Sequence, residues 1–199
     1  MKPILICLSL IFVFSATVSA DEPNGAKRNY ISFALGGYVP SGDLDDEGYK
    51  SGSDFAVSYM SPVKKYFGFG GGIHTYSTES SRTSADIGNG EFAALGIEGL
   101  FYLQLNHRRI QPYFALGPAI YFNGLEYEED ADDDEIDESG SGFGFVTKVG
   151  VRAFFNKRFF GGVVLKAFSN QWNVEIEDGK DKSYQFGGGV MAFELGFTF

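Results

Sequence analysis

Apolar side chains recur at every second position through most of this chain, most plainly in its last nine residues, MAFELGFTF. A period of two is that of a β-strand, whose successive side chains point to opposite faces. Eight segments follow this pattern, at about 29–39, 53–60, 66–77, 91–103, 112–122, 141–155, 159–168 and 183–199. The chain is therefore expected to be all-β, with eight strands.

The predicted connections alternate in length. Long polar stretches follow the first, third, fifth and seventh strands, at 40–52, 78–90, 123–140 and 169–182. Shorter ones follow the second, fourth and sixth, at 61–65, 104–111 and 156–158. This alternation is typical of a membrane barrel, with long loops on the outer side and short turns on the periplasmic side. Both chain ends are then expected on the side of the turns.

The two faces of each predicted strand differ in size. One carries large apolar residues, and the other carries glycine, alanine and a few charges; glycine makes up 27 of the 199 residues. We expect the apolar face to contact lipid and the small residues to fill a narrow lumen. In hydrocarbon an open sheet edge would leave backbone groups unsatisfied. The expected fold is an eight-stranded antiparallel up-and-down transmembrane β-barrel. Pro118 falls inside the fifth strand, where it cannot donate a ladder hydrogen bond, and is expected to mark a bulge.

Six charged residues fall on the inward face. They are Asp54, Glu98 and Glu194, and Lys148, Arg152 and Lys166. A buried charge is costly unless it is paired, so we expect these residues to form a network. The network would serve either as a polar conduit or as a structural plug, and the small diameter favours the plug.

Seven apolar residues also point inward by the alternation. They would either line a narrow path or simply pack the lumen. They are Phe92, Leu100, Val146, Phe154, Val164, Phe168 and Val190.

The first twenty residues have the features of a secretory signal peptide. A basic start precedes an apolar run, and small residues lead to an expected cleavage after Ala20. The single cysteine, Cys7, lies inside this segment, so residues 21–199 contain no thiol for a disulfide. Residues 21–199 are expected to form one outer-membrane barrel domain.

The net charge of −10 is concentrated between Glu126 and Glu138, where ten of thirteen residues are carboxylates. Asp130, Asp132 and Asp134 are spaced as in a calcium loop, but Glu135 and Ser141 break the EF-hand pattern. A solvated charge run is the preferred interpretation, and a cation bridge to lipopolysaccharide phosphates is the weaker hypothesis. No cofactor is predicted, and no basic patch indicates nucleic acid.

A catalytic role has one candidate set, in which His74 would act with Ser77, Ser80 or Ser81 and with Glu79. Its spacing matches no acyl-transfer motif. An enzyme that modifies lipid A is therefore the least favoured hypothesis, and no catalytic residue is predicted.

Three segments resemble the small outer-membrane β-barrel family of Gram-negative bacteria, of the OmpW, OmpX and OmpA type. They are YISFALGGYVPSGDLDDEGY, RIQPYFALGPAIYF and MAFELGFTF, and the first is nearest to the OmpW-like branch. The resemblance implies residence in the outer membrane among lipid and lipopolysaccharide. The OmpW-like branch implies a narrow channel for small hydrophobic molecules. A structural or surface-interaction barrel with acidic extracellular loops is the alternative.

The resemblance also implies that the barrel assembly machinery reads the terminal stripe during insertion. The matching residues are Phe193, Leu195, Phe197 and Phe199. A closed small barrel needs no partner subunit, so a monomer is expected.

Overall fold

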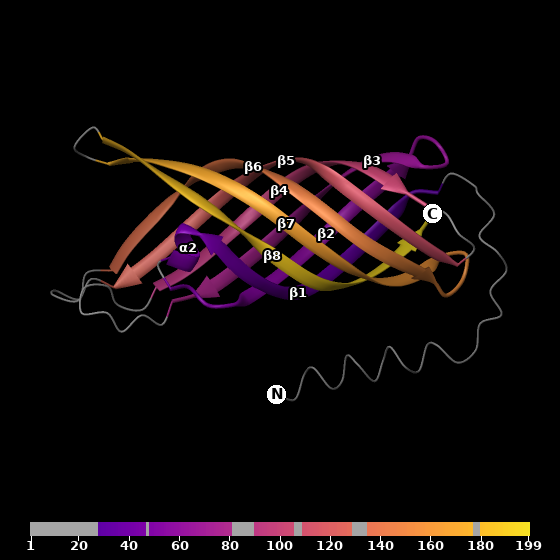
Figure 1. Ribbon diagram of the computed structural model, residues 1–199, viewed down its shortest axis with the longest axis horizontal. Helices are drawn as coiled ribbons and strands as arrows, with labels where there is room; N and C mark the ends of the chain where they lie inside the picture. Colours follow the sequence, from indigo (N-terminus) through magenta and orange to yellow (C-terminus); the bar gives the residue numbers. More distant parts are fainter. Residues whose placement is uncertain (1–27, 47, 81–89, 106–108, 129–134, 177–179) are drawn as a thin grey trace, which may run out of the picture.

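The computed structural model describes residues 28–46, 48–80, 90–105, 109–128, 135–176 and 180–199. For 126–128, 135–138, 173–176 and 180–182 it describes the backbone alone. Within these residues the chain forms eight strands and one short helix (Figure 1). They are β1 (Tyr30–Gly42), α2 (Asp43–Asp46), β2 (Gly52–Pro62), β3 (Phe67–Glu79), β4 (Gly90–Gln104), β5 (Ile110–Glu128), β6 (Glu135–Phe154), β7 (Phe159–Ile176) and β8 (Lys180–Thr198).

The sheet closes on itself. Each strand pairs antiparallel with the next, and β1 pairs with β8 from Tyr30 opposite Thr198 to Gly42 opposite Phe186. The predicted eight-stranded up-and-down antiparallel barrel is thereby confirmed. In the described part of the chain, no helix is both long and apolar enough to cross a membrane.

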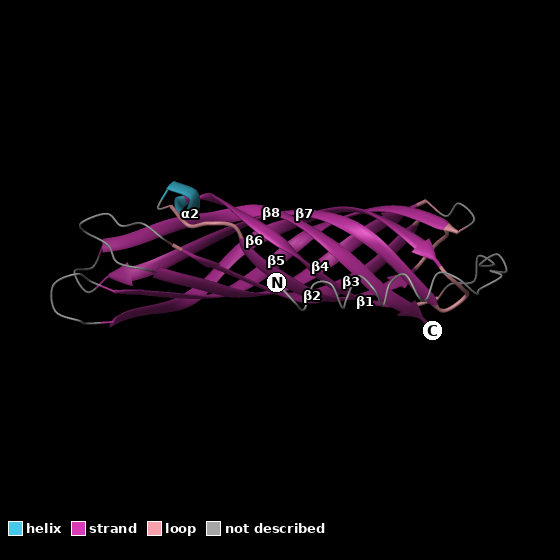
Figure 2. Cartoon of the chain, turned by 90° about the horizontal axis from the view of Figure 1, so that it is seen from below, coloured by secondary structure: helices cyan, strands magenta, loops and turns pink. Residues whose placement is uncertain are grey.

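The two ends of the barrel are built differently. Short turns lie at the end where Asn29 and Phe199 exchange two backbone hydrogen bonds of 3.1 Å. The helix α2 and the tips of the β5–β6 and β7–β8 hairpins lie at the opposite end (Figures 1 and 2). In membrane barrels the short turns face the periplasm, so α2 and the long hairpins lie on the extracellular side.

Four strands are longer than the sequence pattern predicts. The stretches 123–140 and 169–182 were expected as loops, but β5 and β6 stay paired to Glu128 opposite Glu135, and β7 and β8 to Ile176 opposite Lys180. Only ~9–11 residues are needed to cross the bilayer. Beyond it, backbone pairing continues without the apolar alternation on which the prediction relied.

Pro118 causes no bulge. The register between β4 and β5 is the same on both sides of it, from Glu98 opposite Ala119 to Phe101 opposite Leu116. The pairs between these two points are missing, because proline has no N–H to donate. On its other side Pro118 stays in register with Phe145, so the bulge prediction is wrong.

The large apolar residues point outward, as predicted. Phe193 is 67% exposed, Leu35 62% and Phe145 59%, whereas their neighbours in sequence face the interior. An apolar surface of this extent is stable only against lipid. Hydrocarbon therefore surrounds the strands, and the ordered packing lies inside.

Candidate functional site in the barrel interior

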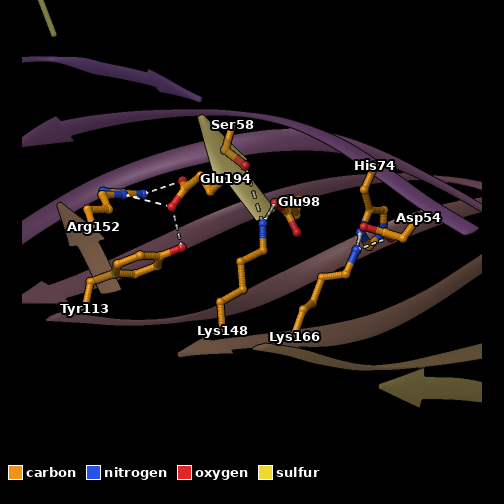
Figure 3. A network of polar contacts seen from close by, with 9 residues as sticks. All are labelled: Asp54, Ser58, His74, Glu98, Tyr113, Lys148, Arg152, Lys166 and Glu194. Carbon is orange, nitrogen blue, oxygen red and sulfur yellow. Dashed lines mark hydrogen bonds and ion pairs between the residues drawn. The ribbon is translucent and has the colours of Figure 1, made fainter. Parts of the chain in front are cut away.

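Three ion pairs follow one another along the barrel axis (Figure 3). Each joins a basic residue of β6 or β7 to a carboxylate on another strand: Arg152 to Glu194, Lys148 to Glu98, and Lys166 to Asp54. All six side chains are buried. The structure thus brings the six inward charges together as three pairs of opposite sign.

The Arg152–Glu194 pair is bidentate. Nη2 of Arg152 donates to Oε1 of Glu194 at 2.9 Å, and Nε donates to Oε2 at 3.1 Å. The hydroxyl of Tyr113 donates to the same Oε2 at 3.1 Å, and its ring lies 4.1 Å from the guanidinium carbon. This fork geometry is the strongest form of an ion pair in proteins, and it fixes β6 to β8 across the lumen.

Lys148 and Lys166 lie directly opposite each other on β6 and β7. Like charges in this position repel, and the structure separates them by giving each its own carboxylate. Lys148 binds Glu98 on β4 and also contacts Oγ of Ser58 at 3.4 Å. Lys166 binds Asp54 on β2, and Nδ1 of His74 lies 2.7 Å from its Nζ.

Aromatic rings fill the lumen between the ion pairs and the outer end. Tyr76 and Phe168 have ring centroids 4.7 Å apart, and Tyr38 lies 4.9 Å from Tyr76. Nearer the outer end, Phe186 packs on Phe92 at 4.9 Å and on Trp172 at 5.8 Å. These contacts form two successive aromatic levels inside the lumen.

A cavity of about 20 Å³ lies among the three ion pairs. Residues of all three pairs line it, with Ser32, Ala34, Tyr102 and Tyr113 among its other walls. A volume of ~10–15 Å³ is needed to hold one water. The cavity among the charges therefore has room for about one water molecule.

The seven apolar residues predicted to point inward are all buried inside the barrel. Two of them pack on other aromatic residues of the lumen: Phe168 contacts Tyr38 and Tyr76, and Phe154 lies 5.4 Å from Phe160.

The catalytic candidates are not brought together. His74 faces the lumen and contacts Lys166, whereas Ser77 faces outward, with its Oγ 3.2 Å from that of Ser53. Ser80 is buried and Glu79 is exposed. Ser81 lies outside the described residues. Neighbours in a strand point to opposite faces, so His74 and Ser77 cannot share one site.

The predicted metal candidates Asp130, Asp132 and Asp134 lie outside the described residues. Among the residues that the structure describes, no group of three or more His, Cys, Asp or Glu side chains is placed to hold a metal ion.

The terminal stripe lies on the lipid side of β8. Phe193, Leu195 and Phe199 are 67%, 49% and 60% exposed, and Phe197 is partly covered. Between them Glu194 points inward to Arg152.

Two lumen features escaped the sequence analysis. Leu44 of α2 is fully buried, because the short helix packs against β1 and β8, where Asp43 accepts a hydrogen bond from the backbone N–H of Gln185 at 2.6 Å. Trp172 fell in a predicted loop, but β7 extends far enough to bury it. The helix begins directly after Gly42, whose φ of +75° suits the turn into it. Gly42 is therefore the residue from which this turn could have been predicted.

Comparison with protein families gives one match. Residues 6–192 match the model of a family described as "Outer membrane protein beta-barrel domain". A search of curated protein sequences finds no match to this chain.

Solved structures with the same fold include three outer-membrane barrels. OprG from Pseudomonas aeruginosa is 11% identical with a TM-score of 0.58, covering 92% of this chain and 99% of its own. Neisserial surface protein A, NspA, is 13% identical with a TM-score of 0.55, covering 86% and 97%. The attachment invasion locus protein Ail of Yersinia pestis, solved with the heparin analogue sucrose octasulfate, is 15% identical with a TM-score of 0.54, covering 87% and 99%. At these identities the likeness shows the fold alone.

Proposed function

We propose that this chain, which belongs to the outer membrane protein beta-barrel domain family and is an integral barrel of the Gram-negative outer membrane, acts through its extracellular rim rather than through its lumen. The supporting observation is the filled interior. Three ion pairs and two aromatic levels leave a cavity of about 20 Å³ among the charges. In this proposal the network is a structural plug, and the chain carries out no catalysis.

The extracellular rim is acidic. In α2, Asp45 and Asp46 are exposed, and Glu79 and Glu91 are exposed at the outer ends of β3 and β4. Of the ten carboxylates between Glu126 and Glu138, five lie in the paired ends of β5 and β6, and the other five fall between Glu128 and Glu135 in the sequence. Ail was solved with a sulfated ligand, but an acidic rim repels such an anion. A cationic partner at the cell surface is the complementary choice.

Conductance in planar bilayers tests the closed lumen. The wild-type protein should give no channel steps, because water has no continuous path. A variant with Tyr38→Ala, Tyr76→Ala and Phe168→Ala removes one aromatic level and serves as the control for a lumen that can open. Regular steps from the wild type would contradict the proposal.

Binding of an oligolysine peptide to the protein in nanodiscs tests the rim. Neutralising the run Glu126–Glu138 with Gln and Asn should abolish binding that 1 M salt also abolishes, because salt screens exposed charges. A variant with the same run in shuffled order keeps the charge and should bind as the wild type does. Equal binding by the neutralised variant would exclude the run as the contact.

Passage of small hydrophobic molecules is the second candidate function. It is favoured by the seven apolar lumen residues, which extend from Phe154 near the turns to Phe92 near the outer end. Passage requires Phe168 to move away from Tyr38 and Tyr76. The variant with Tyr38→Ala, Tyr76→Ala and Phe168→Ala should then speed entry of a lipophilic fluorophore into proteoliposomes, and entry at the wild-type rate would argue against a lumen route.

Residence in the outer membrane implies two further partners, lipopolysaccharide and the barrel assembly machinery. Outer-leaflet lipopolysaccharide would surround the upper part of the barrel, and the assembly machinery would read Phe193, Leu195, Phe197 and Phe199. Phe199→Ser should lower the folded yield in cells, measured by migration on unboiled SDS gels, while refolding into detergent stays unchanged. An equal loss in both would indicate a stability effect. The closed barrel acts as a monomer in this proposal.

A further inference from the structure

The periplasmic end of the barrel carries six basic side chains, here called the basic rim. They are Arg28, Lys64, Lys65, Arg109, Lys157 and Arg158. The described residues at this end, 28–32, 60–70, 100–105, 109–115, 152–162 and 195–199, contain no Asp or Glu. Among these described residues, every charged side chain is basic. The outer rim, in contrast, is acidic.

The basic residues alternate with lipid-facing side chains. Lys64 and Lys65 lie between Val63 and Tyr66, which are 46% and 42% exposed, and Nζ of Lys65 lies 5.1 Å from the centre of the Tyr66 ring. Arg109 precedes Ile110, which is 51% exposed. Apolar side chains at the edge of the membrane band mark the depth at which headgroups begin, so the basic groups lie at the level of lipid phosphates.

A recess in the lipid-facing side of the barrel adjoins the basic rim at Arg158. It has a volume of about 320 Å³ and is lined by Arg158, Phe159, Phe197, Thr198 and Phe199. Its shape is held by Thr198, whose N–H donates to the carbonyl of Arg158 and whose Oγ1 donates to that of Lys157, both at 2.7 Å. Asn156 supports the turn through its Oδ1, which accepts from the N–H of Arg158 at 2.7 Å.

The recess has both apolar and charged lining residues. Phe159, Phe197 and Phe199 are its apolar lining residues, and Arg158 is its charged lining residue. A guanidinium binds phosphate oxygens in a bidentate way, and aromatic rings at a membrane interface pack against the upper acyl chain. A group with a phosphate on an apolar stem fits both parts.

We propose that the basic rim and its recess bind anionic phospholipid headgroups of the inner leaflet. A zwitterionic headgroup brings its own ammonium, which offsets the attraction of six cations, whereas a net negative headgroup does not. Each Lys or Arg near an anionic surface favours association roughly fivefold. The barrel would thus gather anionic lipid around its periplasmic end, independently of any partner at the outer rim.

The test measures which lipid the protein prefers. The full chain is reconstituted in phosphatidylcholine bilayers with trace spin-labelled phosphatidylglycerol or phosphatidylcholine, and electron spin resonance gives their relative association constants. Phosphatidylglycerol should be favoured several-fold at low salt, and the preference should fall toward one in 1 M NaCl, where the screening length is about 3 Å. A ratio of one at low salt would overturn the proposal.

Matched variants locate the preference. Lys64→Gln, Lys65→Gln and Arg158→Gln together should bring the ratio toward one. Lys50→Gln, Lys180→Gln and Lys182→Gln remove the same charge at the opposite end of the barrel and should leave the ratio unchanged. The opposite pattern would overturn the assignment, and migration on unboiled gels checks folding of both.

A soluble polyanion is the competing occupant. Polyglutamate binding to the detergent-solubilised protein, together with no preference for phosphatidylglycerol in bilayers, would assign the rim to such a partner and reject the lipid. A preference in bilayers that Arg158→Lys retains and Arg158→Gln weakens would support a phosphate contact in the recess.

Discussion

The interior and the lipid-facing wall of this barrel are made by the same eight strands, yet they follow different rules. On the wall, large apolar residues such as Leu35 and Phe193 are more than half exposed and need no partner of matching shape, because lipid is fluid. In the interior each side chain has defined neighbours. A glycine often faces a ring there: a Cβ on Gly96 would collide with the imidazole of His74.

The two regions therefore contribute differently to the stability of the fold and to the choice of one strand register. The lipid-facing wall contributes apolar surface, and there one large apolar residue can replace another without loss of a specific contact. The lumen supplies the contacts that exist in one register alone, such as the fork between Arg152 and Glu194. Urea unfolding followed by the fluorescence of Trp172, the single tryptophan, can compare the two regions.

Removal of one lumen charge should have the largest effect. Glu194→Ala leaves Arg152 buried without its carboxylate, and we expect a loss of about 3–5 kcal/mol in the free energy of unfolding. The double variant Glu194→Leu with Arg152→Met replaces the pair with apolar groups and should recover most of that loss. A double variant as unstable as the single one would show that the pair itself, rather than the unpaired charge, decides stability.

A charge on the wall should cost somewhat less. Ile97→Arg places a guanidinium in the apolar band, where the expected loss is about 2–4 kcal/mol. Ser77→Arg, on the same face near the outer edge, should cost about 0–1 kcal/mol. Equal losses at the two positions would contradict the placement of the membrane band.

Two glycines of β4 compare the faces directly. Gly96→Ala should cost about 1–3 kcal/mol, because the added methyl meets His74 and Tyr121 in a filled lumen. Around Gly99, on the outer face, nothing lies within 4 Å of an added Cβ, and Gly99→Ala should stay within about 0.5 kcal/mol of the wild type. A tolerant Gly96 would mean that the lumen is less tightly packed than described.

The smallest effect concerns single hydroxyls. Tyr113→Phe keeps the ring over Arg152 but removes the hydrogen bond to Glu194, with an expected loss of about 1.5 kcal/mol, the low end for a charged acceptor, because Oε2 keeps its bond from Nε of Arg152. The hydroxyl of Tyr121 has no partner in the described structure, so Tyr121→Phe should be neutral or stabilising. The reverse order would show that Tyr121 binds an interior water.

Much of the fold could be predicted, because the alternation of large apolar and small residues along a strand shows which residues share a face. The stripe that includes Phe193 and Leu195 shows which side of β8 contacts lipid. The outer parts of β5 to β8 could not be found in this way. Above the membrane the outward face of these strands is polar, as at Ser169, Gln171 and Gln185, so the lipid-facing apolar stripe that marks a strand in the sequence is absent.

The sequence by itself determined that Asp54, Glu98 and Glu194 point inward with Lys148, Arg152 and Lys166, because inward direction depends only on position within a strand. The tertiary structure decided that Lys148 joins Glu98 while its neighbour Lys166 joins Asp54. Each partner is on a strand that is not adjacent. Their meeting depends on the stagger of the closed sheet, and that stagger is a property of all eight strands together.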